Sequence, residues 1–318
     1  MESMKQWLLI IDGGATKTAC VLVHTGAGEI QYSTSTTGSN YQAIGVESAT
    51  AILQGLLANI ETFLLKHPHS QIAVATFALA GIDSPKDYEI VTGIVQNALA
   101  ATKLQIDTLI IENDAEATLL GVTAGQAGAL LIAGTGAIAY AYDGQQIVRA
   151  GGWGHRAGDE GSGFWLGQEV VRAIFKMEDG RGEPTILKDA VYHTLGIQDV
   201  TELAEWLFQP SYTNAQLAKM GSFVAKAVEQ EDACAIQISL QAAHELALLI
   251  RAILKKIGYQ KGAFPLYCNG GAIKHNPLIL KTFIEKIALT YPQVDIKLCQ
   301  QPPIIYLIER TKRAYDCL

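Results

Sequence analysis

Two turns rich in glycine and threonine, each between apolar strand-like runs, are the segments of this chain best suited to hold phosphate. The first lies in LLIIDGGATKTACVLV, residues 8–23, and the second in ALLIAGTGAIAYAY, residues 129–142. Glycines let the backbone approach a ligand closely, while Thr16, Lys17 and Thr135 add hydroxyls and a cation. An ordinary tight turn is the alternative for either segment alone, but two turns of one design predict a nucleotide held between two halves.

The second turn also fits the dinucleotide fingerprint, with Gly134 and Gly136 and an alanine in the last place. That fingerprint requires a helix directly after the glycines. Residues 137–142 alternate and are β-prone instead, and Asp143-Gly144 then predicts a hairpin turn. The sequence therefore argues against a Rossmann domain.

Polar residues follow two further predicted strands. Asp114 lies in Asn113-Asp114-Ala-Glu116, which follows the apolar run 108–111 at the sheet edge where ligands of α/β folds collect. A helix cap is the alternative at this position, and both readings can hold. Asn40 follows the third predicted strand in Gly38-Ser39-Asn40-Tyr41, where a ligand contact and a helix-capping turn are equally open.

The segment GGWGHRAGDEGSG, residues 151–163, has six glycines in 13 positions together with a tryptophan, a histidine and two acids. A flexible linker would be polar and rich in serine. We therefore predict a binding loop in which Asp159 accepts from sugar hydroxyls and Trp153 offers a flat apolar face; a packed turn is the alternative. Asn269-Gly270-Gly271, after another strand, would let an adenine or ribose lie against the backbone.

The pattern of apolar residues predicts the elements that carry these segments. Strands are expected at 7–12, 18–24, 29–33, 71–79 and 106–111, and helices at 46–66, 85–101 and 115–124. A strand at 128–133 starts the same design again, followed by a meander to 149, a helical stretch from 162 to 230, a helix at 233–257, a strand at 265–268, a helix at 276–288 and a strand at 294–298. We expect two domains, residues 1–116 and 117–318, with a hinge near the helix at 115–124 and a cleft beside it.

Composition narrows the class of protein. The chain has 318 residues, a formal charge of −7 and no basic run longer than Lys255-Lys256, which argues against nucleic acid as a partner. No apolar stretch approaches about 20 residues, and the N-terminal residues do not resemble a signal peptide, so a cytoplasmic protein is expected. The five cysteines lack metal-binding spacing and suit reduced thiols.

Five motifs in this order, LIIDGGATKT, ENDAEA, LIAGTGAIAY, GGWGHRAGDEGSGFWLG and YCNGGA, resemble the BadF/BadG/BcrA/BcrD ATPase family, and within it the N-acetylglucosamine kinase branch. The similarity runs from about Leu8 to Leu298. It implies an α/β fold of two ribonuclease-H-like, actin-like ATPase domains that close on ATP and Mg²⁺ across a hinged cleft.

The resemblance also implies roles for individual positions, as follows. Asp12, Gly13, Gly14, Thr16 and Lys17 match the first phosphate loop, with Asp12 near Mg²⁺, directly or through water; Gly134, Thr135 and Gly136 match the second phosphate loop; Asn269, Gly270 and Gly271 match the adenosine motif; and Asn40, Asp114, Trp153, Gly154, His155 and Asp159 match positions around the sugar, with Asp114 as the catalytic base.

Two positions depart from the family pattern. Ala137 stands where the family usually has a serine that can contact the sugar, and the chain ends in PPIIYLIERTKRAYDCL instead of a helix rich in glycine and alanine. The expected reaction is phosphorylation of N-acetylglucosamine at its 6-hydroxyl. A glucosamine or N-acetylmuramic acid kinase, an ATPase activator of a radical enzyme and a non-enzymatic sugar sensor remain as alternatives. The expected partners are a sugar and a nucleotide, without a membrane, and a homodimer stays open.

Overall fold

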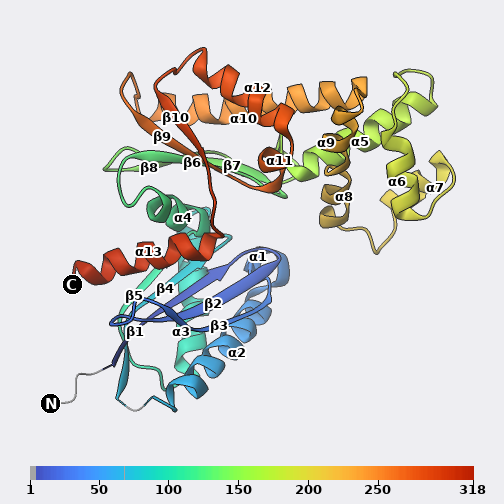
Figure 1. Cartoon of the computed structure of the whole chain (residues 1–318). Coiled ribbons are helices and arrows are strands. Elements are labelled where there is room, and N and C mark those ends of the chain that lie inside the picture. Colours follow the sequence, from blue (N-terminus) through green and yellow to red (C-terminus); the bar gives the residue numbers. More distant parts are fainter. Residues whose placement is uncertain (1–4, 68) are drawn as a thin grey trace. The chain divides into compact units, whose positions relative to one another are not determined.

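The computed structural model describes residues 5–67 and 69–318, and these form two compact units. Unit 1 comprises Met1–Gln126 with Gln300–Leu318, and unit 2 comprises Ala127–Cys299. Each unit is built on one five-stranded mixed sheet with helices (Figure 1).

The sheet of unit 1 has the strand order β3-β2-β1-β4-β5. Its strands are β1 (Lys5–Gly13), β2 (Lys17–His24), β3 (Ile30–Thr37), β4 (Ser70–Leu79) and β5 (Ile106–Glu112). The first three strands form an antiparallel meander, whereas β4 and β5 run parallel to β1. The ends of β1, β4 and β5 therefore meet at one edge, where Asp114 was predicted to lie and where Asp12 lies at the end of β1.

Helices cover both faces of this sheet. They are α1 (Tyr41–Ile44), α2 (Val46–Leu64), α3 (Pro85–Ala100), α4 (Asp114–Val122) and α13 (Pro303–Asp316). Successive side chains of a strand point to opposite faces, so Leu9 and Ile11 pack with α2 and α3, whereas Leu8 and Ile10 pack with α4 and α13. The apolar run in β1 is therefore a strand buried on both sides.

The C-terminal helix α13 belongs to unit 1. It contacts β1, β4 and α4, with Leu307 and Ile308 buried there, and the Thr311 hydroxyl donates to the Thr76 hydroxyl over 2.9 Å. The sequence-based division after residue 116 cuts through α4 and assigns α13 to the second domain. The structure differs from it, because both helices cover the same face of the first sheet.

Unit 2 repeats the topology of unit 1. Its strands are β6 (Gly128–Ala133), β7 (Ala137–Tyr142), β8 (Ile147–Gly151), β9 (Phe264–Asn269) and β10 (Val294–Leu298), in the order β10-β9-β6-β7-β8. The first three are again antiparallel and the last two parallel to β6. The residues after Gly136 form β7 and not a helix, which confirms that this segment is not a Rossmann turn.

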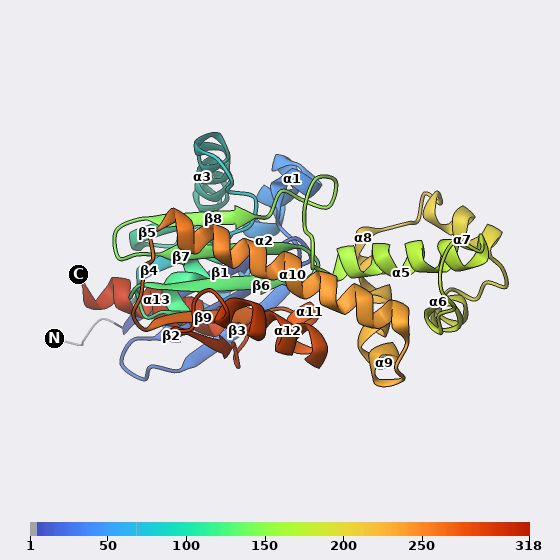
Figure 2. The same cartoon turned by 90° about the horizontal axis from the view of Figure 1, so that it is seen from above.

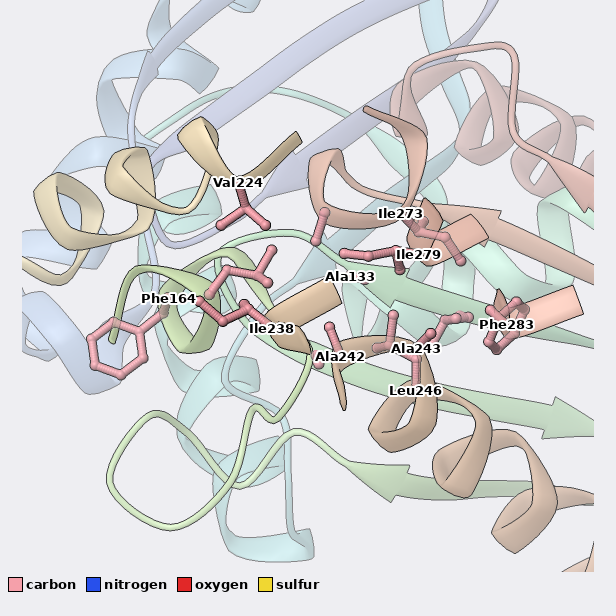
Figure 3. Close-up of a cluster of buried hydrophobic side chains, with 14 of the residues drawn as sticks. Ala133, Phe164, Val224, Ile238, Ala242, Ala243, Leu246, Ile273, Ile279 and Phe283 are labelled. Atoms are coloured by element: carbon pink, nitrogen blue, oxygen red, sulfur yellow. The ribbon is translucent and has the colours of Figure 1, made fainter. Parts of the chain in front are cut away.

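The helices of unit 2 pack mainly against two of them, Ala233–Lys256 and Gly163–Glu178. They are α5 (Gly163–Glu178), α6 (Leu187–Leu195), α7 (Val200–Leu207), α8 (Asn214–Met220), α9 (Phe223–Glu229), α10 (Ala233–Lys256), α11 (Gly271–Lys274) and α12 (Pro277–Ala288). Figure 2 shows α10 lying along the sheet of unit 2, and the helices α5–α9 gather beyond one end of that sheet. Ala242, Ala243 and Leu246 of α10 meet Phe283 of α12 in the core (Figure 3).

Within the described residues, α10 is the one helix whose length and apolar composition would suffice to cross a membrane. Ten of its residues are buried in unit 2. The helix contacts α9, α12, β7 and β8, and a helix in a packed core meets the same criterion of length and composition.

Candidate functional site

The first glycine turn joins β1 to β2 in unit 1. The Gly14 N–H donates to the Lys17 carbonyl over 2.9 Å, and the Gly13 carbonyl accepts from the Ala80 N–H over 2.7 Å. A Cβ at Gly13 would lie 2.4 Å from the Leu79 side chain, so only glycine fits there. Leu79 and Ser39 pack against the turn at Gly13, while Thr16 and Lys17 are exposed.

The segment Gly38–Asn40 is locked onto this turn. The Ser39 N–H donates to the Gly14 carbonyl over 3.1 Å, and a Cβ at Gly38 would lie 2.1 Å from the Ala15 carbonyl oxygen. Asn40 caps α1, because its Oδ1 accepts from the Gln42 N–H over 2.9 Å. The capping interpretation of Asn40 is thus confirmed, and its half-buried side chain stands beside the first phosphate turn.

Asp114 is the first residue of α4, at the end of β5. The cap is the preceding Asn113, whose side chain accepts from the N–H groups of Ala115 at 2.9 Å and Glu116 at 3.2 Å. The Asp114 carboxylate also accepts from the Ala115 N–H at 2.9 Å. Because Asn113 already satisfies the helix start, the Asp114 carboxylate is not required for capping.

The pKa values of both Asp12 and Asp114 are raised, and the charge of Asp12 contributes to the shift at Asp114. Burial raises the pKa of Asp114 to about 7, and the nearby negative charge of Asp12 adds to the increase. Burial also raises the pKa of Asp12 to about 6, against the positive charge of Lys17. Desolvation and a like charge both disfavour the ionised form, and at Asp114 both act to raise the pKa.

Asp12 has the chemistry of a Mg²⁺ ligand. Within residues 5–67 and 69–318, no group of three or more histidine, cysteine, aspartate and glutamate side chains could hold a metal ion by itself. Mg²⁺ usually binds through one or two carboxylates, substrate phosphates and water. Asp12, half-buried and next to a glycine turn, fits that pattern.

The second glycine turn joins β6 to β7 in unit 2 and is tied to the start of α5. The Gly134 N–H donates to the Gly136 carbonyl over 3.0 Å. The carbonyls of Gly134 and Thr135 accept from the N–H groups of Gly163, at 2.7 Å, and Phe164, at 3.2 Å. These bonds hold the turn rigidly, while the Thr135 side chain is exposed.

Asp159 lies against this second turn. It is only 9% exposed and adopts φ 66°, the left-handed region that non-glycine residues rarely occupy. Its carboxylate accepts from the Ala137 N–H over 3.2 Å, and a Cβ at Gly136 would lie 3.1 Å from its oxygens. Burial raises the pKa of Asp159, partly offset by that hydrogen bond. The glycine-rich segment is therefore also a packed turn, as its alternative interpretation predicted.

The other predicted sugar positions in unit 2 lie on the exposed part of the same segment. Trp153 is 70% exposed, and the Arg149 guanidinium lies 4.4 Å from its ring centre. The exposed His155 ring makes an edge contact with Phe164 at 5.2 Å between centroids, and Gly154 adopts φ 82°. Trp153 thus presents an aromatic surface next to Gly154 and His155.

Asn269-Gly270-Gly271 crosses over the end of β6. Gly270 has φ 103°, and a Cβ there would lie 2.2 Å from the Ala133 carbonyl oxygen. The Asn269 side chain accepts from the Gly270 N–H over 2.9 Å, and α11 begins at Gly271. The structure therefore brings this motif directly to the second phosphate turn.

A cavity of about 480 Å³ opens where these segments meet. Its lining residues are Gly134, Thr135, Gly163, Leu166, Ala215, Ala218, Lys219, Gly221, Ser222, Ala225, Gly271, Ala272, His275 and Asn276. Sequence reasoning missed the contribution of α8 and α9. A signal was present, since the small residues Ala215 and Ala218 recur at helical spacing within α8. The small side chains leave room for a flat ring system.

Comparison with known proteins supports one assignment over nearly the full length. The model of the BadF/BadG/BcrA/BcrD ATPase family matches residues 11–304. An N-acetyl-D-glucosamine kinase of Dictyostelium discoideum is 29% identical over 302 residues, covering 92% of this chain and 93% of the relative. An N-acetylmuramic acid/N-acetylglucosamine kinase of Clostridium acetobutylicum is 28% identical over 292 residues, with the same coverage.

Solved structures confirm the fold class. A candidate N-acetylglucosamine kinase from Chromobacterium violaceum superimposes with a TM-score of 0.72 at 23% identity, covering 97% of this chain and 100% of the other. A ROK family glucokinase from Streptomyces griseus, in complex with glucose and AMPPNP, gives a TM-score of 0.54 at 15% identity, covering 96% and 98%. The predicted pair of ribonuclease-H-like domains is therefore correct, and the chain belongs to the BadF/BadG/BcrA/BcrD ATPase family.

Proposed function

We propose that this protein is an ATP-dependent kinase that phosphorylates an amino sugar, with the 6-hydroxyl of N-acetylglucosamine as acceptor. The observation that carries the proposal is Asp114, a half-buried carboxyl at the end of β5. Burial and the charge of Asp12 raise its pKa to about 7. A general base works best when its pKa is near the operating pH. The full-length similarity to kinases named for N-acetylglucosamine supports the choice of substrate.

The nucleotide part of the proposal rests on unit 2. We assign adenosine to the cavity between Gly134, Gly271 and α8–α9, since its small apolar lining accepts a flat ring. The Gly134–Gly136 turn and the Gly13–Lys17 turn would hold the phosphates through backbone N–H groups, hydroxyls and the Lys17 cation. Rigid turns suit this task, because positioned donors lose little entropy when the ligand binds.

The sugar would contact Asn40 and Asp114 of unit 1 and Trp153, Gly154, His155 and Asp159 of unit 2. The oxygen of the sugar hydroxyl attacks the γ-phosphorus while Asp114 accepts the hydroxyl proton. The bond between that phosphorus and the β,γ-bridging oxygen breaks, so that ADP leaves. A Mg²⁺ ion bound near Asp12, directly or through water, would neutralise charge on the phosphates. Lys17 supplies further positive charge.

A coupled assay of ADP release with a panel of sugars tests this proposal. N-acetylglucosamine, glucosamine, N-acetylmuramic acid, N-acetylmannosamine and glucose are compared at equal ATP and Mg²⁺. We expect the highest kcat/KM with N-acetylglucosamine, and product analysis should locate the phosphate on the 6-hydroxyl. Release of ADP that no sugar accelerates would reject the kinase.

The five cysteines are free thiols, in keeping with the cytoplasmic setting that we propose.

A further inference from the structure

The helix α13 is tied to each of the three parallel strands of unit 1 by one polar pair of side chains. The pairs are Tyr315 with Gln6 of β1, Thr311 with Thr76 of β4, and Arg310 with Glu112 of β5. The pair on β5 is an ion pair, in which Nη2 of Arg310 donates to Oε2 of Glu112 over 3.3 Å. An ion pair thus lies among the apolar contacts between α13 and the sheet.

This ion pair is largely removed from water. The side chains of Arg310 and Glu112 are 24% and 15% exposed. Glu112 Oε1 and Arg310 Nε are buried without a hydrogen-bond partner among residues 5–67 and 69–318. Desolvation of two charges offsets their attraction, and apolar side chains of similar size often stabilise a protein as well or better. Stability alone therefore does not explain why an ion pair stands at this position.

The place of the pair in the chain points to another role. Glu112 is the last residue of β5, and Asp114 is the first residue of α4, with the capping residue Asn113 between them. The far end of α4 packs against α13 as well, since a Cβ at Gly121 would lie 2.1 Å from the Tyr306 carbonyl oxygen. The segment that carries Asp114 is therefore held by α13 at both of its ends.

A hydrogen-bonded ion pair fixes position more closely than apolar packing does. Apolar contacts are non-directional, whereas a hydrogen bond weakens steeply when its distance or angle departs from the preferred range. The bond from Arg310 to Glu112 thus fixes the end of β5 relative to α13, and with it the start of α4. A displacement of about 1 Å can lower the rate of a reaction about 10²-fold, even when its cause lies outside the reacting groups.

We infer that Arg310 and Glu112 are positioning residues for phosphoryl transfer, and that their ion pair holds the end of β5 where the Asp114 carboxylate meets the sugar hydroxyl. The inference rests on the proposed function and deepens it. Neither side chain is assigned a contact with sugar or nucleotide, and both act through Asp114. Loss of the pair should therefore lower kcat and leave both KM values nearly unchanged.

The first test separates positioning from stability. Arg310→Met leaves a buried carboxyl without its partner, so we expect a lower Tm, a kcat for N-acetylglucosamine about tenfold to a hundredfold lower, and KM values for sugar and ATP within about threefold of the wild type. The double variant Glu112→Leu/Arg310→Met buries no charge. Its Tm should equal or exceed that of the wild type, while its kcat stays as low as that of Arg310→Met.

Thr311→Val is the matched control, because it breaks the neighbouring polar pair between α13 and β4 and keeps the size of the side chain. We expect it to lower the Tm and to leave kcat within about twofold of the wild type, since Thr76 lies in the middle of its strand and not beside Asp114.

The second test asks whether the pair acts through Asp114. Effects of residues that act as one unit do not add. In the background of Asp114→Asn, Arg310→Met should therefore lower kcat by less than about twofold further. If Arg310→Met does not fold, the apolar double variant takes its place in both tests.

A wild-type kcat in the apolar double variant, a loss that appears in KM and not in kcat, or a full further loss on top of Asp114→Asn would each overturn the inference and leave the kinase proposal intact. A wild type that phosphorylates no hexosamine would instead reject the proposed function, and the inference with it.

Discussion

Asn113 and Asp114 have separate roles, although the sequence left both helix capping and a ligand contact open for Asp114. Asn113 accepts the N–H groups at the start of α4, which is the ordinary structural duty of such a residue. Asp114 is thereby left as a half-buried carboxyl next to Asp12. A helix cap and a reactive carboxyl therefore coexist at neighbouring positions.

Replacing the carboxyl of Asp114 by an amide should stop turnover with little effect on sugar binding. We expect Asp114→Asn to lower kcat by about 10²–10⁴, since that is the usual contribution of a general base, while the sugar Kd changes only a few-fold because the amide still forms hydrogen bonds. Asp107→Asn is the control on the same strand. A variant that keeps more than a tenth of the wild-type kcat would remove Asp114 from the catalytic role.

The raised pKa of Asp114 predicts opposite effects of pH on activity and on stability. The base must be ionised, so kcat/KM for the sugar should decrease as the pH falls below about 7. The folded protein binds this proton more tightly than the unfolded chain does, so between about pH 4 and 7 the carboxyl contributes less stability as the pH rises. Asp114→Asn should therefore have a higher Tm than the wild type at pH 8 and no such advantage at pH 4. Equal differences in Tm at both pH values would contradict the burial argument.

Substitutions of Asp159 and Thr135 should have different effects. The Asp159 carboxylate accepts a hydrogen bond from the backbone next to the second phosphate turn, whereas the Thr135 side chain is exposed. Asp159→Ala removes the acceptor of the Ala137 N–H, and hydrogen bonds to charged groups are worth about 1.5–3 kcal/mol. We expect it to weaken sugar and nucleotide binding together, by roughly tenfold or more for the sugar. Thr135→Val should weaken nucleotide binding alone. Calorimetry showing that Asp159→Ala spares the sugar would mean that its carboxylate is purely structural.

Among the elements, those with a local pattern could be predicted from the sequence. The apolar run in β1, the Ser84-Pro85 start of α3 and the apolar period of α10 each carry their own signal, and the structure places these elements within a few residues of their expected bounds. The packing of α13 on β1, β4 and α4 had no such signal, since it depends on contacts between residues about 200–300 positions apart.

The site shows the same division between local and distant features. The glycine turns and the NGG motif are visible in the sequence as backbone that must approach something closely. The contribution of α8 and α9 to the cavity depends on how a helical insertion folds back onto Gly134 and Gly163. The contact of the Asp159 carboxylate with Ala137 depends likewise on a left-handed backbone at Asp159. The residue types around Asp159 do not predict this conformation.

The close approach of Gly270 to β6 predicts a sharp requirement for glycine. In Gly270→Ala, the new Cβ would meet the Ala133 carbonyl oxygen at 2.2 Å and the positive φ would be strained as well. Gly262→Ala is the control, because Gly262 has φ 115° but open space around it. We expect Gly270→Ala to lower the Tm more than Gly262→Ala does and to weaken ATP binding, measured by calorimetry. Equal effects of the two substitutions would show that the contact with β6 does not matter.

For the whole molecule, the proposed reaction needs both units. Asp12, Asn40 and Asp114 belong to unit 1, whereas the second phosphate turn, Asp159 and the NGG motif belong to unit 2. Each of these two groups of residues belongs to a unit built on one five-stranded sheet, and the two sheets have the same topology. We propose that sugar and ATP are held by residues of both units, and that the γ-phosphate is transferred only when both ligands are bound.

The most direct test is to measure ADP and sugar phosphate from the same reaction, with and without N-acetylglucosamine, at saturating ATP and Mg²⁺. We predict one sugar phosphate per ADP when the sugar is present, and ADP release at least a hundredfold slower when it is absent. ADP formed at the same rate without sugar, and no phosphorylated sugar in its presence, would contradict the account and indicate an ATPase instead of a sugar kinase.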